Sequence, residues 1–220
     1  MCGIFGFKNL DLEIKKIEKE LYHRGPDGFG IKQQKDVTFC HCRLAIVDPS
    51  NKALQPMESN GNMIIFNGEI YNYKELKEEY LKDIKFISLS DTEVLLKLIE
   101  KYGLKILNKL NGMFAFAYYN KETESIFLVN DRYGIKQLFY YIQDNKIAFS
   151  SEDSVLMKVL NIPFKFNQSY IETLYIKDID DFERKLINEN IHSVKAGEYI
   201  EITKDNQIKK NKYYYFNDFD

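Results

Sequence analysis

The chain of 220 residues has no tryptophan, only four prolines and three cysteines, and no excess of positive charge. An odd number of cysteines argues against a disulfide framework and favours free thiols in a reducing compartment. The formal net charge of −2 argues against a nucleic-acid binder, because such proteins normally carry a basic excess on one face. Composition alone therefore disfavours a disulfide-rich secreted protein and a nucleic-acid-binding protein.

Long apolar runs are missing as well. No stretch of about 18 apolar residues occurs, so we expect no transmembrane span. The N-terminus lacks the basic segment and apolar stretch of a secretory signal. Hydrophobic residues still make up 45% of the chain, with 16 Phe and 16 Tyr, which is enough for a sizeable core. We therefore expect a cytoplasmic protein that does not bind a membrane.

Hydrophobic periodicity predicts a mostly β chain with a few helices. Strands are expected at residues 2–7, 37–47, 62–66, 113–119, 126–130, 138–142 and 147–150, and a last hairpin at 198–203 and 208–215. Helices are expected at residues 10–21, 73–81, 91–102 and 152–160. The four strands between 113 and 150 are separated by short turns, which predicts an antiparallel meander. The expected architecture is one α+β domain with stacked antiparallel sheets.

The most informative residue is Cys2, which directly follows the initiator methionine. If Met1 is removed, as is common before a small residue, Cys2 carries both a thiol and a free α-amine. Their reference pKa values are about 8.5 and about 7.7–8.0, so the amine can accept the thiol proton near neutral pH. This is the logic of N-terminal nucleophile enzymes. A cysteine near a chain start usually has no such role, so the hypothesis needs support from other segments.

Two further segments hold polar residues that a plain core would not need. Arg43 lies in an otherwise apolar strand, where it either meets an anion or sits on the solvated face. Asn67 and Gly68 follow a strand, and a carboxamide with a neighbouring glycine N–H can form an oxyanion hole. An ordinary Asn-Gly turn is the alternative for that pair.

Three other patterns are less specific. Asp91 stands at a helix start, where Ser90 or Asp91 could simply cap the helix. The glycine-rich segment 23–30 is a mobile lid or a plain connection, and it lacks the ending of a phosphate-binding P-loop. The run 40–42, Cys-His-Cys, has no second cluster to complete four ligands, and alternation places its histidine on the opposite strand face. We therefore expect no metal site.

Taken together and in this order, the motifs resemble the class II glutamine amidotransferase domain, and within it the glutaminase half of asparagine synthetase. The matching segments are 1–6, 23–27, 43–48, 67–72, 90–93, 111–117, 131–136 and 150–152. The amino-acid sequences at 44–48 and 68–72 favour the asparagine synthetase branch over the glucosamine-phosphate and phosphoribosylamine branches. The resemblance predicts one such domain over residues 1–220, strongest in about the first 160 residues and weaker over 155–220.

The resemblance implies a four-layer αββα sandwich of two antiparallel sheets, the N-terminal nucleophile hydrolase fold. It implies that the thiol of Cys2 attacks the side-chain carboxamide of glutamine, while the α-amine takes and returns the proton. Asn67 and Gly68 would stabilise the oxyanion. The implied substrate-binding residues are Arg43 for the α-carboxylate, and Asp91 with Glu69 for the α-ammonium.

The resemblance also implies partners. The 220 residues contain no Ser-Gly-Gly-Leu-Asp-Ser loop, the pyrophosphate-binding element of the synthetase half. An ATP-dependent synthetase domain or subunit is therefore expected elsewhere as the receiver of ammonia. ATP and Mg²⁺ would act only in that half, with no cofactor in this domain. The family's Gly-Ile-Lys-Pro-Leu-Tyr is Gly-Ile-Lys-Gln-Leu-Phe at 134–139, which leaves the thiol chemistry untouched. A homodimer is one open arrangement.

Two other hypotheses stay open from the sequence. One is a thiol-dependent N-terminal hydrolase that acts on a different amide. The other is a non-catalytic domain that binds glutamine or scaffolds a partner. Hydrolysis of glutamine by Cys2 remains the preferred hypothesis, because a complete set of catalytic residue types is not expected in an idle domain.

Overall fold

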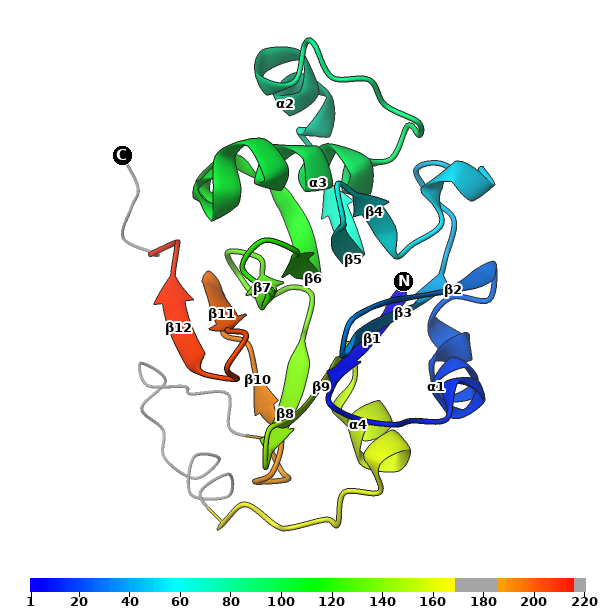
Figure 1. Cartoon of the computed structure of the whole chain (residues 1–220), viewed down its shortest axis with the longest axis vertical. Coiled ribbons are helices and arrows are strands. Elements are labelled where there is room, and N and C mark those ends of the chain that lie inside the picture. The colour runs from blue at the N-terminus through cyan, green and yellow to red at the C-terminus, as the bar shows by residue number, and fades with distance from the viewer. Residues whose placement is uncertain (169–185, 216–220) are drawn as a thin grey trace.

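The computed structural model describes residues 1–168 and 186–215. Its centre consists of two six-stranded antiparallel sheets that face each other (Figure 1). The first sheet has the order β10-β8-β9-β1-β3-β2, with bounds His192–Ser193, Phe139–Gln143, Lys146–Ser150, Gly3–Lys8, Val37–Arg43 and Gly28–Gln34. The second has the order β12-β11-β7-β6-β5-β4, with bounds Ile208–Lys212, Glu198–Ile202, Ser125–Asn130, Gly112–Asn120, Asn62–Ile70 and Met57–Ser59.

Helices cover the outer face of each sheet. Helices α1 (Ile14–Leu21) and α4 (Asp153–Leu160) pack on the first sheet, and α2 (Tyr73–Tyr80) and α3 (Asp91–Tyr102) pack on the second (Figure 1). Short 3₁₀ turns span Tyr22–Arg24, Asn51–Ala53 and Gly103–Lys109. The layers therefore follow the predicted αββα order. Within the described residues, no helix is long and apolar enough to cross a membrane.

The alternation of side chains along each strand builds three apolar layers. In β5, Met63 and Ile65 point into the core between the sheets, while Ile64 and Phe66 pack under α3. In β1, Ile4 enters the core between the sheets, and Phe5 packs under α1 and α4. Each fully buried side chain of this size stabilises the fold by about 1.5–3 kcal/mol. This two-residue period fixes which side chains of β5 can face the first sheet.

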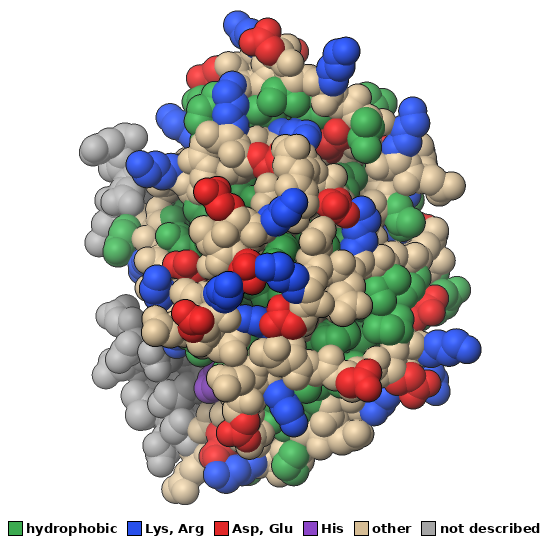
Figure 2. Space-filling view, viewed as in Figure 1, with side chains coloured by type: hydrophobic (Ala, Val, Ile, Leu, Met, Phe, Trp, Pro, Cys, Tyr) green, Lys and Arg blue, Asp and Glu red, His purple; other side chains and the backbone are tan. Residues whose placement is uncertain are grey.

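Charged side chains of both signs are scattered over the surface. On the face drawn in Figure 2, Lys and Arg side chains are interspersed with Asp and Glu side chains. Strand β12, at one edge of the second sheet, carries Lys209, Lys210 and Lys212, and all three lysines are exposed. Lysines on an edge strand discourage pairing with a strand of another molecule.

The structure corrects the predicted meander. Strands β6 and β7 pair in the second sheet, whereas β8 and β9 pair in the first, so the four strands form two separate hairpins. The reason lies in the connection after β7. The buried carboxylate of Asp131 accepts hydrogen bonds from the backbone N–H groups of Tyr133, Ile135 and Lys136, all at 3.0 Å. These bonds turn the chain out of one sheet and into the other.

Three predicted boundaries also differ. The strand predicted over 37–47 ends at Arg43, and the strand predicted over 62–66 continues to Ile70. The predicted loop 23–30 contains a 3₁₀ turn and the start of β2. Other predicted elements are confirmed with shifts of a few residues at most, among them the last hairpin and α3, whose predicted and observed bounds agree.

Candidate active site

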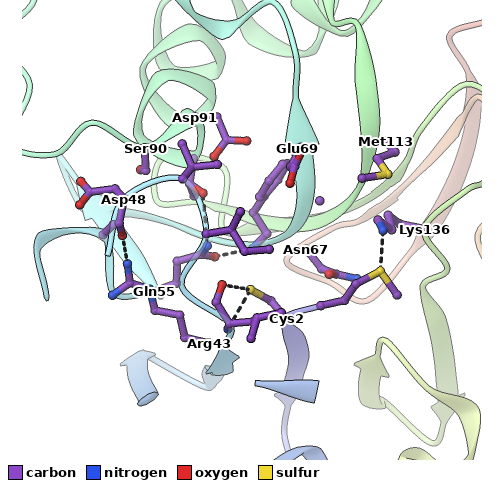
Figure 3. Close-up of a pocket in the computed structure, with 18 residues that line it drawn as sticks. Cys2, Arg43, Asp48, Gln55, Asn67, Glu69, Ser90, Asp91, Met113 and Lys136 are labelled. Carbon is purple, nitrogen blue, oxygen red and sulfur yellow. Dashed lines mark hydrogen bonds between the residues drawn. The ribbon is translucent and has the colours of Figure 1, made fainter. Parts of the chain in front are cut away.

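A cavity of about 160 Å³ opens between the ends of the two sheets, below the typical size of a pocket for a drug-sized ligand. The six residues predicted for the site all line it: Cys2, Arg43, Asn67, Gly68, Glu69 and Asp91. Asn67, Gly68 and Glu69 come from β5, Arg43 from the end of β3 and Asp91 from the start of α3. Figure 3 shows Asp91 and Glu69 on the wall opposite Cys2 and Arg43. The fold therefore brings together residues that lie up to 89 positions apart, between Cys2 and Asp91.

Cys2 lies immediately before β1, with its sulfur held by the chain that follows β3. Its Sγ accepts a hydrogen bond from the N–H of Leu44 at 3.4 Å and lies 3.6 Å from the carbonyl oxygen of Leu44. The guanidinium Nε of Arg24 donates to the carbonyl oxygen of Cys2 at 3.0 Å. Burial raises the pKa of the Cys2 thiol, although the Leu44 amide and nearby positive charges act in the opposite direction. The thiol therefore needs a base to become a nucleophile at neutral pH.

Asn67 belongs to β5 and lies at its end nearest Cys2. Because Met63 and Ile65 face the first sheet, Asn67 and Glu69 continue the same face at the end of the strand. Asn67 is buried, and within the described residues its carboxamide forms no hydrogen bond. Figure 3 places it beside Cys2. A carboxamide in this position is available to a ligand.

The N–H of Gly68 points to the open edge of β5. Opposite it, Phe114 directs its N–H and its carbonyl oxygen away from β5, to Asp131, at 3.1 and 2.8 Å. Gly68 must therefore direct its own N–H away from β6. On that same edge, the N–H of Phe66 donates to Gln55 at 2.6 Å and the N–H of Ile70 donates to Asp91 at 3.0 Å. The N–H of Gly68 lies between these two bonds and faces the cavity.

Only glycine fits at position 68. A Cβ atom there would lie 2.1 Å from the carbonyl oxygen of Met113 and 2.6 Å from the Cα of Phe114. Asn67 and Gly68 are thus part of a continuous strand, so the simple Asn-Gly turn considered from the sequence is wrong. The pair supplies one side-chain donor and one backbone donor, the arrangement that an oxyanion hole needs.

Arg43 ends β3 and is buried, which rules out a place on a solvated strand face. Its guanidinium donates to the carbonyl oxygen of Ser50 at 2.8 Å and to that of Asp48. The carboxylate of Asp48 accepts from the N–H groups of Ser50 and Leu89, at 2.9 and 2.8 Å, so the loop that holds Arg43 is itself fixed. An oriented guanidinium at the cavity wall suits a carboxylate ligand.

Asp91 is the first residue of α3 and not its cap. Ser90 is the N-cap, since its hydroxyl accepts from the N–H of Glu93 at 3.2 Å. Burial raises the pKa of Asp91 to about 6, and the charge of Glu69 adds to the rise. No described residue forms an ion pair with Asp91 or Glu69. Two nearby carboxylates without a described cation are chemically suited to an ammonium group.

Sequence reasoning missed several residues of this site. Gln55 accepts from Phe66 and donates to the hydroxyl of Thr92 at 3.2 Å, which ties β5 to α3. Asp48 and Lys136 lie in motifs that the resemblance used, but no role was predicted for either. A buried amide such as Gln55 has no sequence pattern of its own, because its contacts join distant segments.

Cys40, His41 and Cys42 have structural positions. Burial raises the pKa of both thiols to about 12 and lowers the pKa of His41 to about 3. The neutral imidazole donates from Nε2 to the carbonyl oxygen of Phe66 at 3.3 Å, which helps fix the strand before Asn67. The two cysteines pack under α1, on the opposite face. The described part of the chain holds no group of three His, Cys, Asp or Glu side chains placed for a metal ion.

The model of the glutamine amidotransferase domain matches residues 1–214. This chain belongs to the glutamine amidotransferase domain family. Among curated relatives of this family member, asparagine synthetase [glutamine-hydrolyzing] 1 of Bacillus subtilis is 35% identical over 229 residues, covering 97% of this chain and 35% of the relative. Asparagine synthetase B [glutamine-hydrolyzing] of Escherichia coli is 34% identical over 169 residues, covering 72% of this chain and 30% of the relative.

The amidotransferase domain therefore spans about a third of the length of these relatives. A solved structure of glutamine phosphoribosylpyrophosphate amidotransferase from B. subtilis superposes with a TM-score of 0.71 at 20% identity. The match covers 97% of this chain and 49% of that chain. This likeness shows that the domain shares the fold of that amidotransferase, and the layers are αββα as predicted.

Proposed function

We propose that this domain hydrolyses glutamine to glutamate and ammonia through Cys2, once Met1 has been removed. The observation that carries the proposal is the charge pattern around the thiol. Arg43 lies on one side of the cavity, and the unpaired carboxylates Asp91 and Glu69 lie on another. A free amino acid carries one charge of each sign, so its two α-groups match these walls, and its side chain extends toward Cys2 and Asn67.

The residues account for each step of the reaction. The α-amine of Cys2 takes the thiol proton, and Sγ attacks the amide carbon of glutamine. Asn67 Nδ2 and the N–H of Gly68 hold the negative oxygen of the tetrahedral intermediate. The protonated α-amine then gives its proton to the departing nitrogen, which leaves as ammonia. Water, deprotonated by the same amine, attacks the thioester, and glutamate is released.

Met1 is accessible for the processing that this mechanism requires. It is 54% exposed, and its side chain occupies the cavity wall next to Cys2. Its removal uncovers the amine at the place where the thiol proton must go. Cys2 is half-buried at the cavity wall, which limits the access of bulk water to this short proton transfer.

We further propose that the ammonia serves an ATP-dependent synthetase in the cytoplasm, as another domain or another chain. The relatives named as glutamine-hydrolysing asparagine synthetases, each about three times the length of the matched region, support this partner. ATP and Mg²⁺ would then be used by the partner, while the glutaminase chemistry needs only the side chains and the α-amine described above.

The test is a measurement of glutamate and ammonia released from glutamine by the purified protein, together with intact-mass analysis of its N-terminus. We expect loss of Met1, glutamine turnover, and no turnover by the Cys2→Ala variant. Retained activity in Cys2→Ala contradicts the proposal. Turnover of acyl amides without turnover of glutamine would favour a different N-terminal hydrolase. Retained Met1 with no ammonia release would favour a binding or scaffold domain.

A further inference from the structure

Lys136 places a buried positive charge in the active-site cavity. The residue is only 7% exposed, and it lines the cavity together with Cys2 and Asn67. Within the described residues, the one hydrogen-bond partner of its ammonium is the sulfur of Met1 (Figure 3). A thioether is a weak acceptor, and a buried ammonium without a strong partner is costly. Such a group calls for an explanation beyond packing.

The backbone holds Lys136 firmly in this place. Its N–H donates to the carboxylate of Asp131 at 3.0 Å, and the same carboxylate accepts from Phe114, Tyr133 and Ile135. Asp131 is completely buried. The turn that carries Lys136 is therefore anchored to β6 at its base, and the side chain starts from a fixed point.

Removal of Met1 deletes the partner of Lys136 and exposes the amine of Cys2 beside it. We propose that Lys136 is a positioning residue that acts through Cys2, its charge keeping the new α-amine unprotonated and favouring the thiolate. This inference rests on the proposed function, because it assigns the base of that reaction its working protonation state. A cation near an amine disfavours the ammonium form, and the same cation favours an adjacent thiolate.

Arg24 and Arg43 are the other cations near Cys2, and their charges lower the pKa of its thiol. Arg24 is paired with Glu152 at 2.7 Å, and His23 lies 2.9 Å from the same carboxylate. Arg43 is bound to two carbonyl oxygens. The remaining charged groups that line this cavity and the adjoining one are Asp48, Glu69, Asp91 and Asp153.

The partners of these carboxylates differ from that of Lys136. Asp48 and Asp153 accept hydrogen bonds from backbone N–H groups. Asp91 and Glu69 line the subsite proposed for the substrate ammonium. Among the described residues Lys136 forms no ion pair, and its one hydrogen-bond partner leaves with Met1. Its charge therefore adds to those of Arg24 and Arg43 beside the amine and the thiol of Cys2.

The experiment measures the rate at which iodoacetamide alkylates Cys2 across pH 5–10, read from the mass of the N-terminal peptide. Lys136→Met keeps the apolar stem and removes the charge, and Lys136→Arg restores a charge. The exposed Lys146→Met is the matched control. We expect the midpoint of the alkylation profile to rise by about 1 pH unit in Lys136→Met, as expected for loss of a nearby charge. It should return toward the original value in Lys136→Arg and stay unchanged in Lys146→Met.

An unchanged midpoint in folded Lys136→Met overturns the inference, and so does an equal rise in Lys146→Met. If Lys136→Met does not fold, Lys136→Gln takes its place with the same expected result. In an enzyme that hydrolyses glutamine, the acid limb of the kcat/KM profile should move upward by the same amount. Alkylation does not require glutamine, so with protein whose Met1 has been removed it tests Lys136 even if the wild type proves inactive, a result that would contradict only the proposed function.

Discussion

Replacing Asp91 by Asn should stabilise the free domain while it weakens glutamine binding. Asp91 is buried at the start of α3, beside Glu69, and no described residue offsets its charge. Its Oδ2 accepts one hydrogen bond, from the N–H of Ile70. The Asp91→Asn variant keeps the shape and an oxygen acceptor for this bond, but it removes the buried charge. The buried charge of Asp91 therefore lowers the stability of the domain when no ligand is bound.

The size of this cost follows from the pKa of Asp91. The rise from 3.8 to about 6 corresponds, at about 1.4 kcal/mol per pH unit, to about 3 kcal/mol. The folded state holds the proton more tightly than the unfolded state does. The penalty is therefore fully present above about pH 6 and disappears as the pH falls from there to 3.8.

Urea unfolding followed by circular dichroism measures this effect directly. We expect the free energy of unfolding of Asp91→Asn to exceed that of the wild type by about 2–3 kcal/mol at pH 7.5, with little difference near pH 4. The exposed Asp83→Asn should show no such pH-dependent gain. Equal stability of wild type and Asp91→Asn at pH 7.5, or a gain that persists at pH 4, refutes the reasoning.

The same substitution should show the opposite effect on substrate. An ion pair and charged hydrogen bond to the ammonium of glutamine are lost, so KM should rise about 10- to 150-fold. In the wild type, KM should rise as the pH falls below about 6, because Asp91 then takes up a proton. A KM for glutamine that is unchanged in Asp91→Asn removes Asp91 from the substrate site.

Three more changes have definite expected outcomes. Gly68→Ala places a Cβ 2.1 Å from the Met113 oxygen, so we expect a loss of about 1–3 kcal/mol by urea unfolding and a lower kcat; wild-type stability would contradict this. Arg43→Lys loses the two-pronged geometry and should raise KM at least about 10-fold in a glutaminase assay; an unchanged KM would exclude a carboxylate contact. Asp131→Ala leaves buried N–H groups unpaired and should lower the free energy of unfolding, measured by urea, by several kcal/mol. A loss below about 1 kcal/mol would show that the turn does not depend on Asp131.

The sequence predicted the αββα layers, and the residues that it named for the site line one cavity, but it did not predict which sheet contains β8 and β9. Cys2, Arg43 and Asp91 each have an ordinary structural interpretation when taken alone, and only their occurrence in an ordered set of motifs predicts a site. The assignment of β8 and β9 to the first sheet depends on the hydrogen bonds of Asp131, which no periodicity reveals. A turn that pairs strands and a turn that carries the chain to another sheet have similar composition.

The extent of β5 shows a second limit of sequence analysis. Asn67 and Gly68 have the composition of a turn, yet pairing with β6 continues through Gly68 to Ile70. The close approach of the Met113 carbonyl explains the glycine, and this approach is a tertiary contact. Lys136 was missed for a similar reason, because its burial beside Cys2 results from the crossing between sheets. A residue whose role depends on contact between two distant segments cannot be predicted from the pattern within a single segment.

Labelling with a diazoketone analogue of glutamine tests the central claim most directly. The protein is incubated with the analogue, digested and analysed by mass spectrometry, with excess glutamine as the competing ligand. We predict one adduct, on the sulfur of an N-terminal Cys2, that forms more slowly when glutamine is present and is absent in Cys2→Ala. An unmodified Cys2, or an adduct that glutamine does not slow, would contradict the account.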